Sequence, residues 1–104
     1  MANYIISRKA LDDLSDIWKY SLEVWSEKQA DRYYNEIVQA FEAVSINPSI
    51  GKKYLQLDVL IKGYKVNRHI IFYSLDKENT LYIIRILHEK MDTKSHIATE
   101  VNRE

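Results

Sequence analysis

The sequence predicts an α+β fold in which a short N-terminal strand and a two-helix antiparallel hairpin pack on a twisted antiparallel sheet of three to four strands. Three observations support this prediction. Helical periodicity is confined to the first half of the chain, strand-like runs fill the second half, and a proline followed by a glycine separates the two. A length of 104 residues suits one domain. We assign residues 1–97 to that domain and residues 98–104 to a polar C-terminal tail.

The chain opens with a short strand and a helix. Tyr4-Ile5-Ile6 is a strand candidate, and Ser7 is a residue type that caps helices. From Lys9 to about Trp25, apolar residues recur every three or four positions, which predicts an amphipathic helix. Acidic residues near its start suit the positive end of the helix dipole.

A second helix follows after a very short connection. Ser26 and Gln29 fit a capping box, in which each can satisfy a free amide of the first turn. Helical spacing continues to about Ser45, and Asn47-Pro48 together with Gly51 then predicts a turn. Because the connection is so short, we expect the two helices to lie antiparallel.

The second half of the chain is mostly strand. The segment from Tyr54 to Ile61 is ambiguous and is interpreted as a strand with an irregular stretch. Clearer strands are predicted at Tyr64 to Val66, Arg68 to Leu75 and Thr80 to Leu87, and the polar run Asp76-Lys77-Glu78-Asn79 predicts a hairpin turn.

The last strand is apolar on both faces. Strict alternation assigns its residues to two sets: Leu81, Ile83, Arg85 and Leu87 on one face, and Tyr82, Ile84, Ile86 and His88 on the other. We therefore expect both faces to be covered, one by the helices and part of the other by a partner.

Composition excludes several classes of site. The chain has no cysteine, so disulfides, thiolate zinc sites and a cysteine nucleophile are excluded. Three scattered histidines do not form a metal-binding spacing, and we predict no metal and no cofactor. No apolar run approaches the roughly 18 residues of a membrane span, and the N-terminal apolar run is too short for a secretory signal, so we expect a cytoplasmic protein without membrane contact.

The zero net charge hides an asymmetry. Residues 1–49 carry five basic and eight acidic residues, a balance of −3, whereas residues 50–104 carry ten basic and seven acidic residues, a balance of +3. Between residues 51 and 75 a single acidic residue, Asp58, accompanies five basic ones: Lys52, Lys53, Lys62, Lys65 and Arg68. A positive sheet edge could attract nucleic acid or an acidic protein, although inert surfaces also carry such charge.

Four motifs occur in a fixed order along the chain. They are Asn47 to Gly51, Gly63-Tyr64-Lys65, Arg68 to Tyr73, and Ile84 to Asp92. In order and spacing they resemble the ParE toxins of the RelE/ParE superfamily, the toxic halves of bacterial type II toxin–antitoxin pairs, over residues 4–97. The resemblance implies a RelE/ParE-like toxin domain that forms a hetero-oligomer with a ParD-like antitoxin.

Two arginines and a histidine are candidates for chemistry. Arg85 on a half-buried strand either holds a phosphate or carboxylate, or forms an internal salt bridge to an acidic residue of the helices. Arg68 either binds a partner or belongs to a solvent-exposed turn, and His88 either transfers protons or is simply packed. If the chain is a nuclease, its catalytic candidates are Arg68, Arg85 and His88.

Aromatic and basic side chains supply candidates for protein contacts, although most of the aromatic residues have an alternative reading as core or rim residues. The candidates for antitoxin or target binding are Trp18, Trp25, Tyr34, Lys65, Arg68, Tyr82, Arg85 and Met91.

The superfamily that the chain resembles divides into two activities. RelE-like toxins cut messenger RNA on the ribosome, whereas ParE-like toxins are thought to poison DNA gyrase through protein contact. No Tyr, Phe or Trp follows Tyr82 to stack on a nucleotide, and Glu89 and Asp92 would repel phosphate. We therefore expect gyrase inhibition without direct nucleic-acid binding. A RelE-type ribosome-dependent endoribonuclease and an inactive antitoxin-binding homologue stay open as alternatives.

Overall fold

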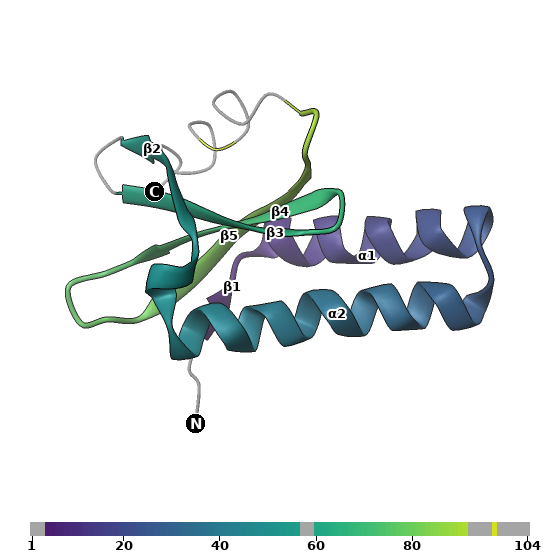
Figure 1. The fold of residues 1–104 in the computed structure, drawn as a ribbon, viewed down its shortest axis with the longest axis horizontal. Coiled ribbons are helices and arrows are strands. Elements are labelled where there is room, and N and C mark those ends of the chain that lie inside the picture. Colours follow the sequence, from purple (N-terminus) through teal and green to yellow (C-terminus); the bar gives the residue numbers. More distant parts are fainter. Residues whose placement is uncertain (1–3, 57–59, 92–96, 98–104) are drawn as a thin grey trace.

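A computed structural model describes residues 4–56, 60–91 and 97. Figure 1 shows two antiparallel helices lying side by side along one face of a twisted sheet. The elements in chain order are β1 (Tyr4–Ile6), α1 (Arg8–Val24), α2 (Glu27–Ile46), the 3₁₀ turn η1 (Pro48–Ile50), β2 (Lys52–Gln56), β3 (Leu60–Val66), β4 (His69–Leu75) and β5 (Leu81–His88). The α+β class and the helical hairpin are thus confirmed.

Both helices begin at the predicted caps. The Ser7 hydroxyl accepts a hydrogen bond from the Ala10 amide at 3.0 Å, and the Ser26 hydroxyl accepts one from the Gln29 amide at 3.2 Å. These bonds satisfy amides that would otherwise lack a partner in the first turn of each helix. The predicted helix ends lie within one residue of the observed ones.

The sheet has five strands in the order β1-β5-β4-β3-β2. Strands β2 to β5 pair antiparallel, as predicted, but β1 pairs parallel with β5, so the sheet is mixed. A parallel pair needs a long connection between its strands, and here most of the chain lies between β1 and β5. The N-terminal strand therefore becomes the fifth strand of the sheet.

A β-bulge in β5 makes the predicted strict alternation wrong. Phe72 pairs with Arg85 but the next residue of β4, Tyr73, pairs with Ile83, so Ile84 is the extra residue. Beyond the bulge the faces exchange, and Ile86 joins the helix-facing core. The sequence pattern hides this shift because the residues on both faces are apolar.

Two apolar clusters lie on opposite faces of the sheet. The helix-side cluster joins α1 and α2 to β4 and β5, with Phe41 and Ile83 fully buried. The second-face cluster consists of Ile61, Ile70, Phe72, Ile84, Leu87 and Ile97. Ile97 has no exposed surface, so this chain itself covers part of the face for which we expected a partner. The predicted tail at 98–104 lies outside the described residues.

No helix within residues 4–56 and 60–91 has the length and apolar character that crossing a bilayer requires.

Candidate functional site

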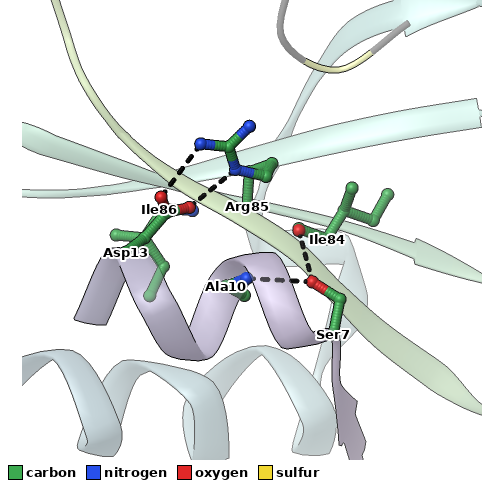
Figure 2. A network of polar contacts seen from close by, with 6 residues as sticks. All are labelled: Ser7, Ala10, Asp13, Ile84, Arg85 and Ile86. Atoms are coloured by element: carbon green, nitrogen blue, oxygen red, sulfur yellow. Dashed lines mark hydrogen bonds and ion pairs between the residues drawn. The ribbon is translucent and has the colours of Figure 1, made fainter. Parts of the chain in front are cut away.

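The Arg85 guanidinium is held by a carboxylate of the first helix (Figure 2). Arg85 donates from Nε to Oδ2 of Asp13 at 2.7 Å and from Nη2 to Oδ1 at 2.9 Å. Both side chains are only 14% exposed. Such a two-bonded, charge-assisted pair is geometrically specific and holds both groups in place. Of the two roles considered for Arg85, the internal salt bridge to a helix is present in the structure.

The same carboxylate also closes an open stretch of the sheet edge. The β1–β5 pairing ends at Ile6 and Ile83, which leaves the following part of β5 without a neighbouring strand on that side. There the Ser7 hydroxyl donates to the Ile84 carbonyl at 2.7 Å, and Asp13 Oδ2 accepts from the Ile86 amide at 3.0 Å. We call this region, formed by Ser7, Asp13 and residues 84–86, the α1–β5 junction.

At the far end of β5, two histidines face each other across the strands. His69 of β4 pairs with His88 of β5, and their ring centroids lie 5.4 Å apart. Tyr33 of α2 reaches this pair with its hydroxyl, 2.7 Å from His69 Nδ1 and 3.0 Å from the Val66 carbonyl. The cluster links α2 to the β3–β4 hairpin.

The His69 imidazole is held in its neutral form. Burial lowers its pKa from 6.5 to about 4, with a further lowering from His88, while Asp13 and Glu89 act in the opposite direction. The neutral ring fits the hydrogen bonds if Nδ1–H donates to the Tyr33 hydroxyl and that hydroxyl donates to Val66. A proton-transfer group must titrate near working pH, so this arrangement favours packing over catalysis for His69.

Charged side chains gather around the same strand end. Lys65 of β3 lies 2.8 Å from Glu89. Hydrogen bonding to Lys65 is the largest cause of the lowered pKa of Glu89. Arg68 is exposed in the turn between β3 and β4, and its carbonyl accepts from the Glu89 amide at 2.8 Å. The structure thus brings Arg68 and His88 to one end of the sheet, whereas Arg85 is turned toward α1.

The aromatic candidates on the helical hairpin are partly exposed. Trp25 is 53% exposed and packs edge-on against Tyr33, and Tyr34 is 38% exposed. Trp18 is half-buried and donates from Nε1 to Asp31 at 3.0 Å. These three side chains therefore present apolar surface from the hairpin.

Two further apolar residues of the helical stripe between Lys9 and Trp25 are exposed. Leu11 is 50% exposed and Leu22 is 37% exposed on α1. Leu11 lies seven residues before Trp18 and Leu22 four residues after it, which places all three on one helix face. This spacing was the sequence signal that could have identified them as part of the same surface. We call the set Leu11, Trp18, Leu22, Trp25 and Tyr34 the hairpin patch.

The last two candidates lie elsewhere. Tyr82 of β5 is 37% exposed and its hydroxyl donates to Asp76 at 3.3 Å, while Met91 is 47% exposed after β5. Over the described ranges, no three His, Cys, Asp or Glu side chains gather in a way that could hold a metal ion.

Comparison with known proteins agrees with this geometry. The model of the ParE toxin of the type II toxin–antitoxin system parDE matches residues 4–93. Toxin ParE1 of Caulobacter vibrioides is 32% identical over 97 residues, covering 93% of this chain and 99% of that protein. Toxin ParE1 of Mycobacterium tuberculosis is 29% identical over 99 residues, covering 92% of this chain and 98% of that protein.

A solved structure shows the same fold. The chromosomal ParDE toxin–antitoxin system from P. aeruginosa contains a chain that superposes with a TM-score of 0.71 at 15% identity, covering 85% of this chain and 96% of that one. The family match over most of the chain decides the classification. This protein belongs to the family of ParE toxins of type II toxin–antitoxin systems.

Proposed function

We propose that this toxin acts in the cytoplasm by inhibiting DNA gyrase through protein–protein contact and that a ParD-like antitoxin neutralises it. The observation that carries the proposal is the bidentate bond between Arg85 and Asp13. A guanidinium that stabilises a phosphoryl transition state has to face the reacting atoms. Here it faces a carboxylate of its own fold, with both side chains mostly buried.

The end of the sheet near His88 also favours binding over hydrolysis. Cleavage of RNA through its 2′-hydroxyl needs a base, an acid and charge stabilisation together. His69 is packed against Tyr33 with a lowered pKa, and Glu89 adds a negative charge beside Lys65. No Tyr, Phe or Trp follows Tyr82 in the sequence to stack on a base.

The hairpin patch supports the proposed antitoxin contact. It combines aliphatic and aromatic side chains that are partly exposed along one helical hairpin. Exposed apolar surface of this kind suits a partner segment that folds on binding, because burial of the patch offsets the entropy cost of ordering that segment. The toxin and antitoxin would then form a hetero-oligomer.

The proposed target can be tested with purified proteins in a DNA supercoiling assay. We expect the toxin to abolish supercoiling by gyrase and to leave gyrase-linked DNA breaks, and we expect added ParD-like antitoxin to reverse both effects. Full supercoiling in the presence of folded toxin that still binds its antitoxin would contradict the proposal and would favour the inactive antitoxin-binding homologue.

A RelE-type endoribonuclease is the second candidate. The observation in its favour is that Lys65, Arg68 and His88 lie near one end of the sheet. The discriminating measurement is cleavage of messenger RNA on translating ribosomes. We expect none, and cleavage that is lost in the His88→Ala variant would favour this second function.

A further inference from the structure

Lysines lie close together on β2 and on the strand beside it. Among the described residues, β2 is the last strand in the sheet order and pairs only with β3. Lys53 of β2 lies directly opposite Lys62 of β3, and Lys52 lies opposite Gly63. We call Lys53 and Lys62, whose side chains share one face of the sheet, the lysine edge; the side chain of Lys52 lies on the opposite face, because successive strand residues alternate. Lys52 and Lys53 are exposed, and Lys62 is half-buried.

The two lysines of this edge lie close enough to repel each other. Like charges placed directly opposite on neighbouring strands repel each other. Among the described residues, the ion pairs are Lys65 with Glu89 and Arg85 with Asp13, and neither involves the lysine edge. The positive charge of this edge is therefore not compensated within the described part of the fold.

Protection against aggregation explains only part of this pattern. Lysine on an edge strand discourages unwanted pairing with another chain. That role is fulfilled by Lys52 and Lys53, because both belong to the edge strand itself. Lys62 lies one strand further in and pairs with Tyr73 on its other side. Its strand therefore has no unpaired backbone edge that a lysine would protect. Lys62 does raise the local positive potential beside Lys53.

The position of the lysine edge separates it from the hairpin patch. In Figure 1, β2 lies at the end of the molecule opposite the connection between α1 and α2. Trp25 of the hairpin patch follows α1 at that connection. One surface is apolar and the other is cationic, so they suit partners of different chemistry.

We propose that the lysine edge is the surface through which the toxin docks onto an acidic patch of its target protein; this rests on the proposed function. A register shift between Lys53 and Leu55 interrupts the regular ladder of β2, so the side-chain charges rather than an added strand carry the recognition. A protein target fits better than nucleic acid, because the two lysines of this edge neutralise too few phosphates for tight binding.

The experiment compares two double charge reversals in the supercoiling assay. Lys53→Glu/Lys62→Glu alters the lysine edge. Lys19→Glu/Lys28→Glu changes net charge equally on exposed positions of α1 and α2. We expect the edge variant to need about tenfold more protein for half inhibition at low salt, and its dependence on salt to weaken. The control variant should inhibit like the wild type.

Circular dichroism shows whether each variant is folded, and the milder Lys53→Gln/Lys62→Gln variant replaces the reversal if that protein does not fold. Unchanged inhibition by a folded edge variant would overturn the inference and leave the proposed function intact. An equal loss of antitoxin affinity in the edge variant would also overturn the inference, because the edge would then belong to the antitoxin contact. The same holds if the wild type binds DNA directly and the edge variant loses that binding. A wild-type toxin that does not inhibit gyrase would remove the proposed function and this inference together.

Discussion

Positive charge is paired within the fold at the α1–β5 junction, whereas no described ion pair accompanies it at the lysine edge. At the junction, Arg85 is mostly buried and forms two bonds to Asp13. At the edge, Lys53 and Lys62 face each other across two strands without a described ion pair. A buried guanidinium must be compensated within the fold, whereas exposed ammonium groups keep their hydration until a partner replaces it. The contrast indicates that Arg85 supports the architecture and that the edge is available for recognition.

The largest expected effect tests the junction. Asp13→Ala removes the acceptor for Arg85 and for the Ile86 amide at a site where both charged side chains are mostly buried. We expect the free energy of unfolding to fall by about 3–5 kcal/mol. Chemical denaturation measures this change, with Asp16→Ala as the control because Asp16 is exposed on the same helix. Equal, small losses for both variants would show that the junction is not structural.

The next effect concerns the anchoring of the lysine edge. The Tyr73 hydroxyl donates to the Pro48 carbonyl at 2.5 Å and accepts from the Gly51 amide at 3.0 Å, just before β2 begins. A methyl group at Gly51 would collide with the Tyr73 hydroxyl. We expect Gly51→Ala to cost about 1–3 kcal/mol, measured by thermal denaturation. Ser49→Ala, in the same turn but exposed, serves as the control and should change stability little.

A third test uses pH and concerns His69, a half-buried group that stays neutral where Arg85 is charged and paired. The folded chain holds His69 neutral with a pKa of about 4, below its ordinary 6.5. Between these values the unfolded chain binds a proton that the folded chain does not, so stability falls as pH decreases from about 6.5 toward 4. Denaturation midpoints measured from pH 7 to pH 5 should show this decline.

The control for the pH test is His69→Phe, which keeps a ring at this position but cannot titrate. Its stability should change less over the same pH range than that of the wild type. Identical pH profiles for the two proteins would contradict the neutral, half-buried state of His69.

The smallest effect tests the edge. Lys53→Gln removes one member of the opposed lysine pair, and relief of the repulsion should raise stability by about 0.5 kcal/mol or less at low salt. High salt should abolish the gain, since exposed charges are screened. Lys19→Gln provides the matched control on α1. A clear loss of stability in Lys53→Gln would mean that the lysine has a structural partner.

Much of this fold could be predicted from local signals. Helical spacing and the serine caps at Ser7 and Ser26 located both helices closely, because capping chemistry acts within one turn. The polar turn after β4 could also be predicted from the sequence. Asp76 organises this turn by accepting hydrogen bonds from the Glu78 and Thr80 amides. These features depend on neighbours in the sequence.

The features that could not be predicted depend on distant pairs. The parallel β1–β5 pairing and the partnership of Asp13 with Arg85 join residues more than seventy positions apart. The bulge at Ile84 was hidden because both faces of β5 are apolar. Burial of Ile97 on the second sheet face left no periodic signal in a polar segment.

The most direct test of the central claim removes both charges of the junction and keeps a polar side chain at each position. Asp13→Asn together with Arg85→Gln leaves an amide at both positions but abolishes the guanidinium charge. Supercoiling by gyrase should be measured with this variant after its folding and antitoxin binding have been verified. We predict inhibition within about threefold of the wild type, since a contact surface elsewhere is intact. A folded, antitoxin-binding variant that has lost all inhibition would contradict the claim that Arg85 serves the architecture.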